Sequence, residues 1–325
     1  MNNQIHYSPW LNRIAVLTAG ATFLLIIIGG VVTSTESGLA VPDWPTTFGY
    51  NMFLYPLSEM VGGILYEHSH RLMGSIVGLL TITLLVMLLA IDTRKWLKWL
   101  GLVALIAVII QGVLGGLRVT ELSITLAILH ACLAQAFFAL LCGISWFTSR
   151  KWFTNTISTE NVDNSQNTKR LQRLSLLTTC FIFIQLIFGA LLRHIGSTLS
   201  STLLLYVLIG VHIFLALMIT LHIFLFIRRF FSVGSESHEI SGRLPLLLLG
   251  LVGIQVILGI GAYLTRLTFI GETISSVLTD LITTSHVAVG ALMLVSSFVM
   301  TLMLFQSKLS SIPMETTIDN TLVTE

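Results

Sequence analysis

Residues 72–90, LMGSIVGLLTITLLVMLLA, form an apolar run without a charged side chain. About 20 such residues in a helix cross the hydrocarbon core of a bilayer. Backbone amides in hydrocarbon must bond within their own segment, and this run lacks the alternation of a barrel strand, so it predicts a membrane-spanning helix. Working outward, seven further runs have the same character. The eight predicted spans are 14–34, 60–90, 97–117, 122–147, 173–193, 201–227, 244–265 and 280–305.

The composition agrees with a chain that lies almost wholly in the bilayer. Of its 325 residues, 54% are hydrophobic and only 10% are charged, and the mean hydropathy is +0.90. These values exclude an ordinary soluble domain. We therefore expect an all-α membrane protein with the lipid bilayer as its surroundings and without a nucleic-acid partner.

The distribution of Lys and Arg predicts the orientation of the chain. Thirteen of the 17 basic residues lie in alternate connections, which by the positive-inside tendency are cytoplasmic. Both termini are then cytoplasmic, and a bacterial plasma membrane is the simplest location. The four exceptions lie at predicted outer helix ends, and they are Arg71, Arg118, Arg193 and Arg266. One arginine at such an end favours snorkelling to lipid headgroups, but four in a pattern favour an anionic ligand.

An internal repeat divides the chain into similar halves. Gln and Gly recur four residues apart, as Gln111 with Gly115, Gln185 with Gly189, and Gln255 with Gly259. This spacing places both side chains on one helix face, where Gly permits close packing and Gln can bond across the interface. The polar segment 154–167 predicts a cytoplasmic linker between two four-helix bundles, 1–153 and 168–325.

Each predicted helical hairpin carries one histidine near its outer end. These four are His70, His130, His212 and His286. Imidazoles that face each other in pairs inside an apolar bundle suit six-coordinate haem iron, which takes one axial nitrogen from each side. Zinc or copper sites usually need more converging ligands. The outer arginines suit haem propionates, because a guanidinium binds carboxylate in a planar fork.

Glu67 makes the two halves different. It precedes His70 by three residues and so shares its helix face, whereas the other three histidines have no carboxylate at that offset. We therefore expect chemistry in the first bundle and an electron relay in the second.

The remaining histidines and the cysteines are expected to be structural or solvated. His222 is predicted to pack, His194 to lie in an outer loop, His238 in an inner loop and His6 in the tail. His68 points away from His70. It is expected to pack against neighbouring helices, and the alternative is that it supports a propionate or Glu67. Cys132, Cys142 and Cys180 fall inside predicted spans, where packing is their expected role.

These residues together resemble the haem A synthase family, in its bacterial and mitochondrial forms, over nearly the whole chain. The resemblance rests on the spaced histidines and on three further phrases, which are Glu67-His-Ser-His-Arg71, the Gln111 to Arg118 phrase, and the loop runs Ser37-Gly-Leu-Ala40 and Pro42-Asp-Trp-Pro45. It implies a two-bundle fold and oxidation of the C8 methyl group of haem O to a formyl group, through hydroxylated intermediates, to give haem A. It also implies haem b as a redox cofactor.

By matching position, the resemblance assigns roles to individual residues. His70 and His130 would hold the haem O substrate, His212 and His286 would ligate haem b, and Glu67 would be the catalytic carboxylate. We place Arg71, Arg118 and Gln111 in the substrate site by their position. In the same way, Arg193, Arg266, Gln185 and Gln255 are placed in the haem b site. Expected partners are the haem O-producing farnesyltransferase, oxidase assembly factors and a second copy of the chain.

One departure from the family concerns the first outer loop. Many members carry a cysteine pair there, and the corresponding residues in this chain are Val41 and Thr47. Thiol chemistry in that loop is therefore excluded here.

Two other functions use the same histidines. A di-haem b-type electron-transfer subunit would need four histidines but no Glu67, and a haem exporter or carrier would explain the arginines but not two doubly ligated sites. Only a synthase would make haem A.

Overall fold

A computed structural model of the chain describes residues 7–157, 166–195, 202–232 and 243–306, and within these it is helical throughout its regular structure. The long helices are α1 (Pro9–Ser34), α2 (Gly62–Ile91), α3 (Lys95–Thr120), α4 (Ile124–Phe147), α6 (Gln166–Ile195), α7 (Thr202–Ser232), α8 (Arg243–Leu267) and α9 (Ser276–Leu304). All eight are long and apolar enough to cross a membrane. The predicted all-α membrane fold with eight spans is thus confirmed, with helix ends shifted by a few residues.

Short helices lie between the long ones. A short helix α5 (Arg150–Ile157) follows α4, and the described loops contain the short 3-10 helices η1 (Met52–Leu54), η2 (Leu57–Glu59) and η5 (Phe269–Thr273). The apolar runs did not predict α5, because eight residues are too few to cross a bilayer. Of the predicted linker 154–167, the first residues end α5, the last begin α6, and 158–165 lie outside the described residues.

Serine side chains fix the starts of three helices. Ser8, Ser123 and Ser275 each accept a hydrogen bond from the backbone amide three residues later. Such a cap satisfies one of the amides that the first turn of a helix leaves without a partner. Each helix therefore begins where the sequence changes from a polar cap to an apolar run.

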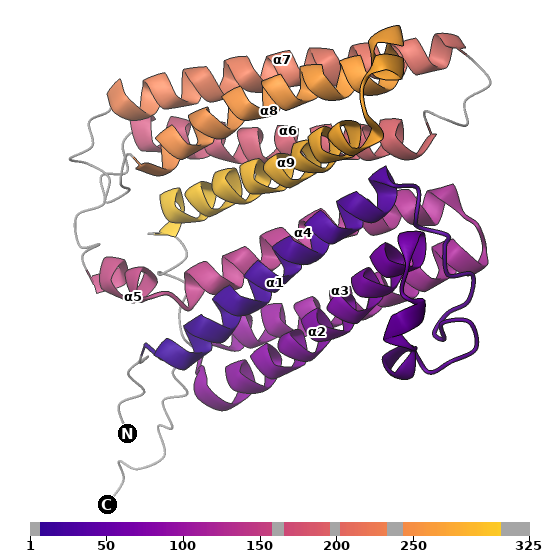
Figure 1. The fold of residues 1–325 in the computed structure, drawn as a ribbon. Helices are drawn as coiled ribbons and strands as arrows, with labels where there is room; N and C mark the ends of the chain where they lie inside the picture. The colour runs from indigo at the N-terminus through magenta and orange to yellow at the C-terminus, as the bar shows by residue number, and fades with distance from the viewer. Residues whose placement is uncertain (1–6, 158–165, 196–201, 233–242, 307–325) are drawn as a thin grey trace, which may run out of the picture.

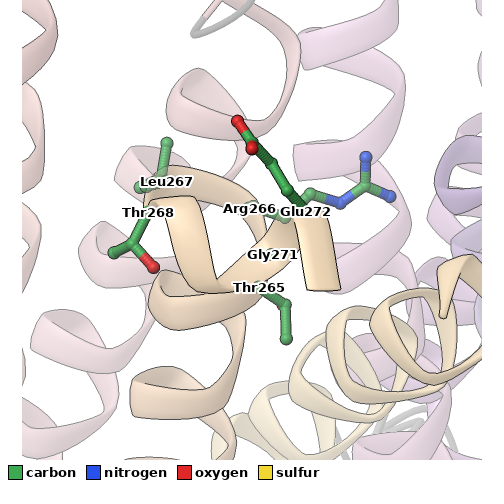
Figure 2. A pocket seen from close by; sticks show the side chains of 6 residues that line it. All are labelled: Thr265, Arg266, Leu267, Thr268, Gly271 and Glu272. Atoms are coloured by element: carbon green, nitrogen blue, oxygen red, sulfur yellow. The ribbon is translucent and has the colours of Figure 1, made fainter. Parts of the chain in front are cut away.

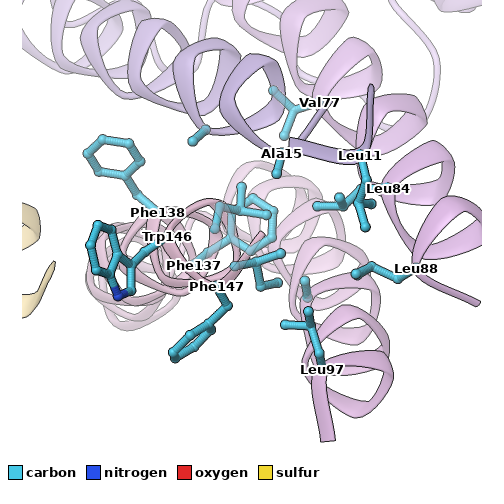
Figure 3. Close-up of a cluster of buried hydrophobic side chains, with 14 of the residues drawn as sticks. Leu11, Ala15, Val77, Leu84, Leu88, Leu97, Phe137, Phe138, Trp146 and Phe147 are labelled. Carbon is cyan, nitrogen blue, oxygen red and sulfur yellow. The ribbon is translucent and has the colours of Figure 1, made fainter. Parts of the chain in front are cut away.

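The helices form two groups of four (Figure 1). In the first, α1, α2, α3 and α4 pack in a ring, each against the next, and in the second α6, α7, α8 and α9 do the same. The first group is held by a cluster of buried apolar side chains that includes Leu84, Leu88 and Leu97 and the rings of Phe137 and Phe147 (Figure 3). A second cluster, with Phe226 and Phe230, fills the other group. The two groups are called the first and second bundle below.

Helix α9 forms the centre of the interface between the bundles. It contacts α1 and α4 of the first bundle. In its most apolar 18-residue stretch 56% of the residues are buried, whereas the figure for α7 is 6%. Small side chains allow these helices to approach closely. A methyl group on Gly30 of α1 would lie 3.1 Å from Cγ2 of Thr284 on α9. Ser34 Oγ bonds the hydroxyls of Thr283 and Thr284 at 3.0 Å each.

The chain between α1 and α2, residues 35–61, is the longest described connection and is called the first loop. It lies at the end of the molecule where α1 ends and α2 begins, which we call the loop end. Positive-inside reasoning predicts that the loop end faces outward. The four exceptional arginines all lie at this end, since Arg71 is near the start of α2 and the others are in the last turns of α3, α6 and α8.

Candidate functional site

In each bundle, two helices that do not adjoin in the ring carry the predicted histidines. His70 on α2 and His130 on α4 meet inside the first bundle, with ring centroids 6.4 Å apart. Two imidazoles on opposite sides of one metal ion, at about 2 Å from metal to nitrogen, would have centroids about 6 Å apart. The sequence-predicted pair is therefore brought together with a spacing that suits axial ligation.

A glycine on the preceding helix lies behind each histidine ring. A methyl group on Gly29, Gly115, Gly189 or Gly259 would lie 2.9, 3.1, 3.4 and 3.1 Å from Cε1 of His70, His130, His212 and His286, respectively. Real Cβ contacts are rarely as short as those at Gly29, Gly115 and Gly259, so these three positions favour glycine, whereas the contact at Gly189 is an ordinary van der Waals distance. Each bundle thus alternates Gly, His, Gly and His around its ring of helices.

The second bundle repeats this placement with His212 on α7 and His286 on α9, each beside the glycine of the preceding helix. Gln185 Nε2 donates to the backbone oxygen of His212 at 2.9 Å, and Gln255 Nε2 lies 3.4 Å from Nε2 of His286. In the first bundle, His130 Nδ1 lies 3.1 Å from the backbone oxygen of Gln111. Each repeat glutamine is therefore beside the histidine of its own hairpin.

Buried polar atoms without hydrogen-bond partners concentrate at these histidines. Within the described chain they include Nδ1 of His70, His212 and His286 and Oε1 of Gln111, Gln185 and Gln255. Buried polar atoms are normally paired, so such a cluster points to a ligand. No three His, Cys, Asp or Glu side chains in the described part converge as a metal cluster would require. Paired imidazoles are the donor set of a bis-histidine haem, and the residues present fit that group.

Glu67 lies on the same helix face as His70 and is 4% exposed. Its Oε1 accepts a hydrogen bond from Arg71 Nη2 at 2.7 Å, and its Oε2 accepts one from the backbone amide of Val41 at 2.8 Å. A carboxylate has about four acceptor sites, so these two bonds leave capacity for a further donor. Glu67 therefore lies between the histidine pair and the first loop.

The other exceptional arginines have different partners. Arg193 Nη2 donates to Ser34 Oγ at 2.7 Å, which joins α6 to α1. Arg266 Nη2 donates to the Ser34 backbone oxygen at 2.9 Å and pairs with Asp280 at 3.1 Å. The Arg118 guanidinium packs against Gly38 of the first loop. Positive charge thus gathers where the two bundles meet at the loop end.

The remaining predicted histidines are not part of the two pairs. His222 Nδ1 bonds Thr178 Oγ1 at 2.8 Å and its ring packs on Phe181, as its packing prediction requires. His194 was expected in a loop but lies in the last turn of α6, because that helix continues to Ile195. His6 and His238 lie outside the described residues.

The structure also has a shallow pocket where α8 turns into η5 (Figure 2), and no paired histidine lines it.

Comparison with known proteins identifies the family. A family model for cytochrome oxidase assembly proteins, COX15-CtaA, matches residues 12–204, more than half of the chain. The chain belongs to this family. The match includes the first bundle with Glu67, His70 and His130, whereas His212 and His286 lie beyond it.

Three bacterial relatives named heme A synthase have similar sequences. The chain is 28% identical to that of Shouchella clausii over 205 residues, which is 59% of this chain and 62% of the relative. It is 29% identical to that of an Exiguobacterium species over 180 residues (54% and 55%) and 30% identical to that of Exiguobacterium sibiricum over 192 residues (57% and 61%). The chain thus matches about three fifths of the length of these relatives.

The sequence did not predict several contacts of the site. Gly29 was not paired with His70, because the first predicted helix lacks the Gln and Arg of the repeat. The Gly29-Gly30 dipeptide was the available signal, since two glycines near the end of a span favour close packing. The role of Ser34 between the bundles had no signal, because single serines are common at helix ends.

Proposed function

We propose that this chain is a haem A synthase, which oxidises the C8 methyl group of haem O to a formyl group. The observation that carries the proposal is the His70 and His130 pair, 6.4 Å apart and backed by glycines, with the buried carboxylate of Glu67 beside it. Membership of the family and the names of the three relatives support it.

In this proposal the first bundle, residues 1–153, holds the substrate. His70 and His130 would bind the iron of haem O from its two sides. Gln111 supplies an unpartnered buried oxygen next to His130, and Arg118 supplies a guanidinium at the loop end for a propionate. Arg71 is assigned to the same site.

The second bundle, residues 168–325, would hold haem b between His212 and His286. When bound there, haem b would supply one-electron redox chemistry. Gln185 and Gln255 lie beside these two histidines, and their unpartnered oxygens support a ligand at this place. Arg193 and Arg266 lie at the loop end of α6 and α8, where a haem carboxylate would meet solvent.

Glu67 is proposed as the catalytic carboxylate. Each hydroxylation of the methyl carbon would add an oxygen from water and release two protons and two electrons, the electrons passing to an external one-electron acceptor by the redox chemistry that bound haem b supplies. The second hydroxylation gives a hydrate that loses water to leave the aldehyde. A carboxylate near the reacting carbon would accept a proton from the attacking water, and its charge would stabilise a developing cation. No other histidine of the set has a carboxylate at this offset, which supports chemistry in the first bundle alone.

The membrane context of the proposal follows from the charges. We propose a bacterial plasma membrane with both termini cytoplasmic and the histidine pairs toward the outer face. Haem O would come from a farnesyltransferase, and haem A would pass to oxidase assembly factors. We also propose that the chain associates with a second copy of itself in the membrane.

Analysis of extracted pigment tests the proposal. Pyridine haemochrome spectra of cells with and without the gene should show haem A only when the gene is present. A di-haem electron-transfer subunit would instead change only the amount of haem b. A carrier would not change which haems are present. Absence of haem A in cells that supply haem O would overturn the proposal.

A further inference from the structure

The first loop is packed on the loop end of the first bundle. Its Val41 and Thr47 are fully buried although they belong to a connection between helices. The Trp44 ring lies against Gly116 of α3, next to Gly115, which backs His130. The loop therefore covers the end of the bundle that contains the first histidine pair.

One side chain, Arg71, holds the loop at three backbone oxygens. Its Nη1 donates to the oxygens of Asp43 at 2.7 Å and Thr46 at 3.1 Å, and its Nη2 donates to the oxygen of Val41 at 2.9 Å. The Arg71 side chain is only 9% exposed. A guanidinium has five donors in a fixed fork, so one residue can bind several parts of a loop at once.

Glu67 completes the same set of contacts. Because it accepts from the Val41 amide and from Arg71, the ion pair holds Val41 at both its amide and its carbonyl. The next residue, His68, places Nδ1 3.1 Å from Thr47 Oγ1. Three polar side chains within five residues of α2, Glu67, His68 and Arg71, thus contact the loop.

No disulfide bond links this loop to the helices. The three cysteines of the chain are free, and they lie in α4 and α6. The contacts that Glu67, His68 and Arg71 make with the loop are hydrogen bonds, and the ion pair between Glu67 and Arg71 lies within α2. All of these can break and re-form without a redox reaction. Opening of the loop would therefore need no redox reaction.

We propose that Glu67 and Arg71 form a non-covalent latch that holds the first loop as a lid over the histidine site of the first bundle. Arg71 is then a positioning residue, which fixes both the lid and the direction of the Glu67 carboxylate. The identity of the molecule under the lid rests on the proposed function, whereas the latch itself does not. Substrate entry would require the latch to open.

Hydrogen exchange measured by mass spectrometry on the full chain in nanodiscs tests the latch. Arg71→Ala should speed exchange of the amides of residues 41–50 by about tenfold or more, because each lost bond to a charged group is a strong one. The matched control is Arg94→Ala. Arg94 forms an equally buried pair with Asp92 at 2.6 Å and also donates to a backbone oxygen, but at the opposite end of the bundle. Unchanged loop exchange in Arg71→Ala, or an equal rise in the control, would overturn the latch.

A second variant keeps the test sharp if Arg71→Ala does not fold. Thr47→Val preserves the shape of the side chain and removes only the hydrogen bond to His68. It should raise exchange of the same segment by a smaller factor and leave exchange in α6 to α9 unchanged. Loop exchange equal to that of the unaltered chain would contradict the lid.

Binding kinetics separate a lid from a purely structural loop. With haemin as the probe, Thr47→Val should increase both the rate of uptake and the rate of release, with little change in affinity. A structural role would weaken affinity without faster uptake, and that result would overturn the lid. Because neither measurement needs haem A formation, a faster-opening lid in a chain that makes no haem A would refute only the proposed function.

Discussion

Gly29 of α1 leaves no room for a side chain beside His70 of α2, since a methyl group there would lie 2.9 Å from the ring carbon Cε1. The ring is therefore positioned by a backbone rather than by a side chain. Gly115 and Gly259 are similarly close to His130 and His286, at 3.1 Å each, whereas Gly189 is at ordinary contact distance from His212. A substitution at the glycine can therefore displace the proposed iron-binding histidine while leaving the histidine in the sequence.

Gly29→Ala should displace His70 and weaken haem binding in the first bundle. Overpacking of this kind costs about 1–3 kcal/mol, whereas Ala in an open helix position is favoured over Gly by about 0.5–1 kcal/mol. Gly20→Ala on the same helix is the control, because a methyl group there meets no atom within 4 Å. Haemin titration and thermal unfolding of both purified variants measure the difference. Equal behaviour of the two would show that the glycine does not position the ring.

His212→Ala and His286→Ala should each reduce tightly bound haem b to less than about half, because the iron would lose an axial nitrogen. Pyridine haemochrome analysis of the purified protein measures the loss. His222→Ala, which removes a histidine bonded to Thr178, should leave the haem content unchanged. If both paired variants retain normal haem and spectra, the second bundle is not the haem b site.

Arg118→Ala, Arg193→Ala and Arg266→Ala should weaken retention of haem during gel filtration, and the corresponding Lys variants should be milder. A lysine keeps the charge but loses the planar fork that matches a carboxylate. Arg193 also bonds Ser34, so Ser34→Ala serves as the control for loss of the bonds at Ser34 Oγ, which include those to Thr283 and Thr284, with the Arg193 guanidinium retained. A haem-bound structure in which these guanidinium groups point into lipid headgroups would refute the propionate assignment.

Glu67→Gln should lower haem A output by about 10²-fold or more, in the range expected for a positioned acid or base, while haem b binding persists. Cellular pigment analysis measures the output. Hydrogen exchange of residues 41–50 in the same variant shows how much of the effect passes through the loop, because Gln retains one acceptor for the Val41 amide. Near-normal haem A production would leave Glu67 with a structural role only.

Asp43 predicts a response of the first loop to acid. Burial opposes the shift, but hydrogen bonds from the Gly49 amide, the Thr46 hydroxyl and the Phe48 amide lower the pKa of Asp43 below its ordinary value of 3.8. A lowered pKa in the folded state means that the stabilisation is fully present above pH 3.8 and is lost as the pH falls through the lowered value.

Hydrogen exchange of residues 43–50, corrected for its intrinsic pH dependence, should therefore stay constant from pH 7 to about 5 and rise below about 4. In Asp43→Asn the segment should exchange faster at every pH, without the acid step. A step of the same size in the Asn variant would exclude Asp43 as its origin.

The helices and the histidine pairs could be predicted from the sequence because their signals are local. Apolar length predicts a span, and a histidine within such a span is costly enough to mark a site. The repeat of Gln and Gly then predicted which histidines share a role. The pairing of His70 with His130 across the first bundle followed from the count of helices.

The contacts of the first loop could not be predicted in this way. Arg71 binds the backbone oxygens of Val41, Asp43 and Thr46, and every residue has such an oxygen, so the sequence contains no mark of them. Arg71 was assigned to the substrate site by its position, whereas its described partners are Glu67 and residues of the first loop. Burial of Thr47 against His68 also depends on how the loop folds back, which has no periodic signal.

Gly29 and Gly30 lie next to each other on α1 but serve different bundles, because successive helix residues point about 100° apart. Gly29 faces His70 in the first bundle, and Gly30 faces Thr284, two residues before His286, in the second. A single substitution that displaces this part of α1 would therefore alter the packing of both bundles at once. Whatever their origin, the halves are not free to evolve separately here, and a compensating change for a larger residue at Gly30 should be sought on α9.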